Sequence, residues 1–167
     1  MKRALILISL LQILSFSQLA GQEKSFNFIL VIDGQLWITN TSIAISFPSS
    51  NGSDLTQAVA TYYPGELVFE QQEYEKIKNS KIDSLTMSFD YYEYQGKKQF
   101  LYNFDLPFYA SWLDQSYMVM KVYNLEKRKY KGVFKPLDKE RNYTFELDYP
   151  GGQMLRVRNK VKKKRNK

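Results

Sequence analysis

The chain has 167 residues and a formal net charge of +7, and it contains neither cysteine nor histidine. Their absence excludes thiol nucleophiles, Ser-His-Asp triads and ordinary zinc sites, and it removes the commonest general base near neutral pH. We therefore predict that the protein is not an enzyme and uses no metal and no cofactor.

The first 20 residues have the layout of a secretory signal peptide. Lys2 and Arg3 precede an apolar run from Ala4 to Leu14, and small and polar residues follow it. The run is shorter than the roughly 20 apolar residues that a membrane-spanning helix needs. We expect an exported protein, periplasmic or associated with the cell surface, with Gly21 as a working start of the mature chain. An uncleaved signal anchor is the alternative.

Alternation of apolar and polar residues predicts strands along most of the remaining chain. In chain order, the expected elements are a strand over 26–32, a strand over 43–47, a short helix over 70–79, and strands over 85–91, 100–106, 117–123 and 143–149. The runs 26–32 and 117–123 are apolar on both sides, which predicts central strands covered on both faces. Turn signals such as Asp33-Gly34 and Gln95-Gly96 separate the elements.

Short strands at this spacing are typical of an all-β sandwich. We predict one antiparallel β-sandwich of about seven strands over residues 21–158, transthyretin-like or immunoglobulin-like, with at most one short helix. Residues 1–20 form the signal peptide in this interpretation, and residues 159–167 form a disordered basic tail.

Residues 62–94, YYPGELVFEQQEYEKIKNSKIDSLTMSFDYYEY, resemble part of a carboxypeptidase regulatory-like domain, a transthyretin-like β-sandwich of exported bacterial proteins. The positions that match its glycine and its two strands are Gly65, Leu67, Phe69, Leu85, Ser88, Tyr91 and Tyr92. The acidic turn that usually precedes the glycine is replaced by Tyr62-Tyr63-Pro64, and a glycine often found before the last tyrosine is absent. The resemblance implies a fold and an accessory, non-catalytic role, and it carries over no site residues.

Exposed aromatic residues are the main candidates for binding. Neighbouring strand residues point to opposite faces, so one of Tyr91 and Tyr92 is expected to be exposed. We predict that Tyr92, Tyr94 and Trp112 offer a platform for sugar rings, an extended peptide or another protein. The alternative is that these side chains only fill half-buried strand positions.

Four acids lie close together in the middle of the chain, at Glu66, Glu70, Glu73 and Glu75. A carbohydrate-active enzyme needs two carboxylates about 5–10 Å apart, which makes such an enzyme the alternative hypothesis. A solvated acidic surface is the simpler interpretation. The other acids follow no calcium-loop spacing.

Residues 156–167 contain eight cations and no acid. Without Lys2 and Arg3 the net charge is +5, and without the eight cations it falls to −3, so the basic character is local. We expect an anionic envelope surface, phospholipid or lipopolysaccharide, to be contacted by Lys160, Lys162, Lys163, Lys164, Arg165 and Lys167. A tail that only aids solubility and a nucleic-acid-binding tail are the alternatives, and export disfavours the second. The sequence as a whole predicts an exported, non-catalytic binding or structural module at a bacterial cell envelope.

Overall fold

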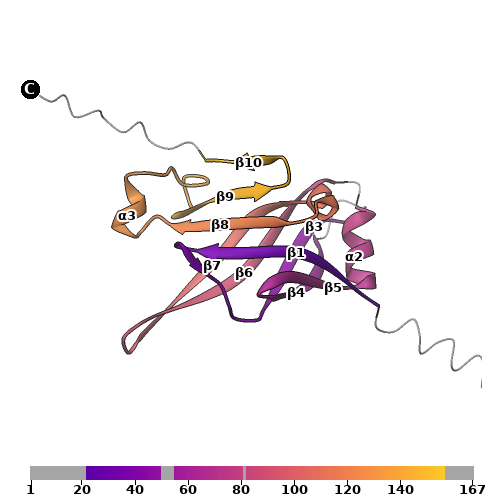
Figure 1. Ribbon diagram of the computed structural model, residues 1–167, viewed down its shortest axis with the longest axis horizontal. Helices are drawn as coiled ribbons and strands as arrows, with labels where there is room; N and C mark the ends of the chain where they lie inside the picture. Colours follow the sequence, from indigo (N-terminus) through magenta and orange to yellow (C-terminus); the bar gives the residue numbers. More distant parts are fainter. Residues whose placement is uncertain (1–21, 50–54, 81, 157–167) are drawn as a thin grey trace, which may run out of the picture.

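The computed structural model describes residues 22–49, 55–80 and 82–156, and its strands belong to one continuous sheet (Figure 1). Across the sheet the order is β10, β9, β8, β1, β5, β4, β3, β6, β7, and β2 pairs with β1. The strands are β1 (Glu23–Ile32), β2 (Gln35–Leu36), β3 (Thr41–Pro48), β4 (Leu55–Tyr63), β5 (Gly65–Glu70), β6 (Ser84–Gln95), β7 (Lys98–Tyr109), β8 (Met118–Asn124), β9 (Tyr143–Tyr149) and β10 (Gly152–Met154). The helical elements are α2 (Gln71–Lys78), the 3-10 helix η1 (Ala110–Asp114) and α3 (Arg128–Lys131).

The all-β prediction is confirmed, but the predicted numbers of strands and of helices are corrected. The strand predicted over 143–149 coincides with β9, the other five predicted strands overlap β1, β3, β6, β7 and β8, and the predicted helix matches α2. The sheet has ten strands rather than about seven: β2, β4, β5 and β10 lie outside the six predicted strand ranges, and β2 and β10 have only two and three residues. At most one short helix was expected, and this is wrong, since η1 and α3 are also present.

The centre of the sheet contains a parallel pair, which corrects the prediction of a purely antiparallel arrangement. β1 pairs with β8 in parallel from Phe28 opposite Met118 to Ile32 opposite Val122, while its other edge pairs with β5 in the antiparallel direction. The inward residues of both strands are fully buried, whereas Ile29 is only half-buried on the outer face. The two strands are therefore central, but their outer faces are only partly covered. The sandwich arrangement stays a prediction.

The sheet curls so that its two ends meet around one aromatic core. β9, β8 and β1 cross over β3, β6 and β7 in Figure 1, and the buried side chains of both groups belong to the same cluster. The rings of Phe104 in β7 and Tyr143 in β9 lie 5.1 Å apart in an edge-to-face arrangement, which is favourable for aromatic pairs.

Side chains from the start of β9 block the outer edge of β7. The Tyr143 hydroxyl accepts a hydrogen bond from the Asp105 amide (2.8 Å) and donates to the Asp105 carbonyl (2.9 Å). The Arg141 guanidinium donates to the same carbonyl at 2.8 Å. Two residues further along this edge, Pro107 has no N–H to offer. This edge is therefore closed to further strands near its middle.

The proposed signal peptide (1–20) and basic tail (159–167) lie outside the described residues, as do all six cations predicted to contact an anionic surface. In the part of the chain that is described, none of the helices has the length and apolar character needed to cross a bilayer.

Candidate functional site

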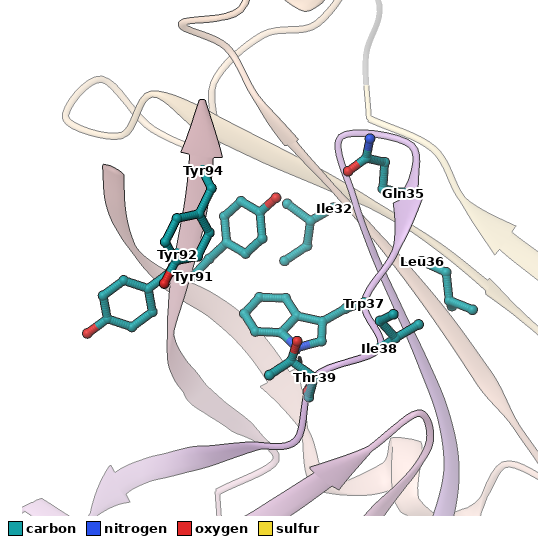
Figure 2. Close-up of a pocket in the computed structure, with 9 residues that line it drawn as sticks. All are labelled: Ile32, Gln35, Leu36, Trp37, Ile38, Thr39, Tyr91, Tyr92 and Tyr94. Carbon is teal, nitrogen blue, oxygen red and sulfur yellow. Dashed lines mark hydrogen bonds between the residues drawn. The ribbon is translucent and has the colours of Figure 1, made fainter. Parts of the chain in front are cut away.

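A groove opens where two strands end before their neighbours do. β5 pairs with β1 only as far as Phe28, and beyond it β2 pairs with Val31 and Ile32. In the same way, β3 pairs with β6 only as far as Ser88, whereas β6 continues to Gln95. The β1–β2 hairpin and the distal part of β6 thus line a groove with no described strand between them (Figure 2).

The β1–β2 turn sets the position of one groove wall. Asp33 and Gly34 both have positive φ angles, 55° and 84°, as a two-residue type I′ hairpin turn requires. The Asp33 carboxylate compensates for its unusual backbone conformation by accepting a hydrogen bond from the buried Asn124 amide at 2.8 Å. The turn is thereby fixed to the end of β8.

Trp37 forms the floor of the groove. Its ring centroid lies 4.9 Å from that of Tyr91 and 5.9 Å from that of Phe89, and only 9% of the residue is exposed. The Trp37 amide donates to the Leu30 carbonyl at 2.9 Å. Where β5 has ended, the buried Tyr62 hydroxyl accepts from the Leu30 amide (3.2 Å) and donates to the Trp37 carbonyl (3.1 Å). A side chain from β4 thus holds the floor in place of a strand.

Two of the three predicted binding residues line the groove. Tyr92 is 48% exposed and Tyr94 is 70% exposed, whereas Tyr91 is half-buried and points toward Ile32 and Trp37 (Figure 2). Tyr92 is thus the exposed member of its pair. Leu36 and Ile38 add exposed apolar surface on the opposite wall. Two hollows of about 260 and 610 Å³ share Trp37 and Tyr92 and form one groove along β6.

Trp112 does not belong to this groove, which corrects the predicted grouping. It lies in η1 and packs against Phe108 (5.5 Å) and Tyr109 (5.0 Å). Tyr109 is opposite Ser84 at the base of the β6–β7 hairpin, while Tyr92 lies near its tip. At about 3.3 Å per residue, the strand separates the two ends by roughly 25 Å.

The residue that sequence reasoning missed is Trp37. The sequence feature that could have indicated it is the run Leu36-Trp37-Ile38, three apolar residues shortly after the turn at Asp33-Gly34. Such a run does not alternate like a half-buried strand, and it is too apolar for a loop.

The backbone of β6 presents unpaired groups to the groove. Gln95 and Lys98 close a two-residue turn, so alternate residues of β6, including Tyr91 and Glu93, bond to β7. The remaining residues of β6 direct their amide and carbonyl groups away from β7. As far as Ser88, these groups face β3. Beyond Ser88 no described strand pairs with this edge. We call the outward backbone of Asp90, Tyr92 and Tyr94 the free edge.

A compact ion cluster joins the β1–β2 turn to β6. The Lys127 ammonium lies 2.7 Å from the Asp33 carboxylate and 2.8 Å from the Glu93 carboxylate. Asp33 exposes only 5% of its side chain, so the cluster is substantially shielded from water. Through Lys127, the segment after β8 is tied to both the β1–β2 turn and β6.

The cluster controls the ionisation of the neighbouring groups. Burial by itself raises the pKa of Glu93, but hydrogen bonds from Lys127 and Gln95 outweigh it and leave that pKa below its usual value. Burial likewise opposes the charge on Lys127, and the two carboxylates overcome it, so the pKa of Lys127 is raised. Burial and the Glu93 charge raise the pKa of Tyr91, so its phenol stays protonated at neutral pH.

The acidic residues of the middle segment do not all converge: Glu70 and Glu73 line one hollow together with Glu23, and Glu66 is not part of its lining. Glu66 and Glu70 are exposed and lie four residues apart on the outer face of β5, which places them about 13 Å from each other. Glu73 instead accepts a hydrogen bond from the Val59 amide at 3.0 Å and pairs with Lys76. Burial would raise the pKa of Glu73, and these two contacts lower it. The spacing that a glycosidase needs is thus not met by Glu66 and Glu70.

Within residues 22–49, 55–80 and 82–156, no group of three or more acids is placed to hold a metal ion. Comparisons with protein-family models, with curated proteins and with solved structures find no match for this chain.

Proposed function

We propose that the protein is an exported, non-catalytic module of a bacterial cell envelope that binds an extended peptide segment in the groove between β2 and β6. The observation that carries the proposal is the free edge of β6. It presents outward amide and carbonyl groups beside a hollow floored by Trp37.

Strand addition explains why both features occur together. A peptide that pairs with a sheet edge gains affinity from main-chain hydrogen bonds, and its alternate side chains enter pockets that determine specificity. Here the free edge supplies the hydrogen bonds, and the hollow beside Trp37 and Tyr91 accepts an apolar side chain. Tyr92 and Tyr94 offer flat contact surface with few rotatable bonds.

A glycan would use the aromatic rings but not the backbone edge, since sugar rings stack on aromatic faces without a repeating main-chain pattern. The unpaired backbone therefore favours a peptide over a sugar.

The remaining parts of the proposal rest on sequence. The signal peptide supports export, the basic tail supports attachment to an anionic envelope surface, and the resemblance to carboxypeptidase regulatory-like domains supports an accessory role and a sandwich-like arrangement of the curled sheet.

The test uses a library of random 12-residue peptides displayed on phage, followed by affinity measurement with the peptides selected. Tyr92→Pro removes an N–H from the free edge and leaves the β7 ladder intact, and we expect it to weaken peptide binding about tenfold or more. Tyr92→Ala separates loss of the ring from loss of the N–H. Leu101→Pro, directly opposite on the outer edge of β7, is the matched control and should leave affinity unchanged.

Equal effects of Tyr92→Pro and Leu101→Pro would contradict strand addition. Envelope glycan fragments form a second arm, and glycan binding that needs the Tyr92 ring but not its N–H would replace the peptide by a sugar.

A further inference from the structure

The turn that contains α3 concentrates exposed positive charge. Residues 128–135 include no acid, and their four cations are all exposed: Arg128, Lys129, Lys131 and Lys135. None of the four forms an ion pair with a described acid. We call this segment the basic turn.

Aromatic packing holds the basic turn against β8. The Phe134 ring stacks on the Tyr123 ring with centroids 4.4 Å apart, and the Tyr130 ring lies 5.1 Å from the same ring. Backbone hydrogen bonds from Val133 and Phe134 to the Tyr130 carbonyl, 2.9 and 3.1 Å long, close the turn. The aromatic side chains of the turn thus face the sheet while its cations face solvent.

Ionic contacts fix the turn at its beginning. Lys127, the residue before α3, is held by Asp33 and Glu93, and Lys129 donates to the Asp33 carbonyl at 3.0 Å. Because the backbone of the turn is already ordered, binding through its cations requires little further loss of chain entropy.

The surrounding charge makes the basic turn distinctive. Residues 22–155 carry a net charge of −3, so this segment is a local reversal of the sign of the body. β10 ends on the side of the molecule that carries α3 (Figure 1).

We infer that the basic turn is a docking surface for the anionic phospholipid headgroups of a membrane. Exposed cations close to an anionic bilayer are attracted to it without a shaped pocket. Val133, 39% exposed among these cations, adds the apolar contact that membrane interfaces accept. Single-stranded nucleic acid is the weaker fit, since it is bound by exposed stacking rings, and the rings of this turn pack against Tyr123. The inference does not depend on peptide binding in the groove.

The test is cosedimentation of the chain from Gln22 to Lys167 with vesicles of phosphatidylglycerol and phosphatidylcholine. Every described strand lies within residues 23–154, so this chain retains the whole sheet. The variant R128Q/K131Q/K135Q should reduce binding about tenfold or more at low salt. The matched control K24Q/K97Q/K98Q removes three exposed lysines that form no ion pair with described acids, and it should change binding by less than about twofold. Circular dichroism checks that each variant is folded.

The same three proteins are then compared in a chain that ends at Arg156. This comparison separates vesicle binding by the basic turn from vesicle binding by residues 157–167. An equal loss in both chains supports the proposal, whereas binding that needs only residues 157–167 overturns it. Binding to vesicles of phosphatidylcholine alone, suppression by inorganic phosphate at constant ionic strength, or binding of a DNA oligonucleotide without vesicle binding would each overturn it as well.

Discussion

The two outward edges of the β6–β7 hairpin differ in what lies against them. On β7, Tyr143 and Arg141 occupy the backbone groups of Asp105, and Pro107 removes the next N–H along the edge. On β6 beyond Ser88, the free edge faces a groove lined with aromatic residues and has no described partner strand. Proteins usually block sheet edges that are not used for binding. Within the described residues, the β7 edge is thus blocked near its middle, whereas the free edge of β6 is not.

The largest expected effect on stability comes from removing the groove floor. Trp37→Ala deletes a buried indole that contacts Phe89 and Tyr91, and we expect the free energy of unfolding in urea to fall by about 3–4 kcal/mol. Trp112→Ala, at the half-buried site on η1, should cost about half as much. Equal losses would show that the groove floor is no better packed than the far end of the hairpin.

The next largest effect is expected at the ion cluster. Lys127→Met leaves the carboxylates of Asp33 and Glu93 without their counterion, and we expect a loss of about 2 kcal/mol, less than at a fully buried pair because Lys127 is 25% exposed. Lys97→Met at the hairpin tip is the control and should have almost no effect.

The pH dependence sharpens this prediction. The pKa of Glu93 is lowered in the folded state, so its contribution is present above the usual pKa of a glutamate and is lost as pH falls through the folded value. Without Lys127, burial is opposed only by the Gln95 hydrogen bond and the charge of Lys129, so the pKa of Glu93 is higher than in the wild type and the contribution of Glu93 to stability is smaller. Thermal melting between pH 3 and pH 6 should show wild-type stability falling on acidification, with the difference between wild type and Lys127→Met narrowing. If the stability difference between wild type and Lys127→Met did not change with pH, the ion pair between Lys127 and Glu93 would not be the cause of the pH dependence.

A smaller effect is expected at the blocked edge. Tyr143→Phe removes the hydroxyl that bridges the amide and carbonyl of Asp105, and the free energy of unfolding should fall by about 1–2 kcal/mol. Tyr102→Phe, at a half-buried tyrosine on β7, the strand that contains Asp105, should be neutral. We also expect Tyr143→Phe to increase self-association in analytical ultracentrifugation because the β7 edge opens. A variant that stays as monomeric and as stable as wild type would show that this bond does not protect the edge.

The least invasive test compares amide hydrogen exchange along β6 in the unmodified protein. The amides of Tyr91 and Glu93 bond to β7 and should be protected at least about tenfold more than those of Tyr92 and Tyr94, which face the groove. Uniform protection along residues 90–94 would mean that another segment covers the free edge.

Local patterns predicted six of the ten strands and α2, but not which strands pair with one another. Tyr143 to Tyr149 alternates strictly, so the bounds of β9 can be read from sequence, and the acids and lysines of residues 70–79 indicate α2. The parallel pairing of β1 with β8 joins segments about 90 residues apart, and no local pattern specifies such a partner.

In the candidate site, too, the local sequence predicted some features, and pairing between distant strands determined the others. The alternation of β6 correctly distinguishes Tyr92 from Tyr91, because exposure depends only on the faces of one strand. The groove itself depends on where β3 and β5 stop, which is a property of pairing across the sheet. The misplacement of Trp112 was avoidable, since the turn at Gly96 fixes a hairpin register that separates Tyr92 from Tyr109.

The parallel pair at the centre of the sheet also governs the timing of folding. β1 is among the first described residues to be synthesised, but one edge of it stays unpaired until β8 exists, about 90 residues later. At about 5–20 residues per second, ribosomes take roughly 5–18 s to cover that distance. For those seconds the chain cannot complete its central sheet, and β1 carries an unpaired edge that other chains can reach.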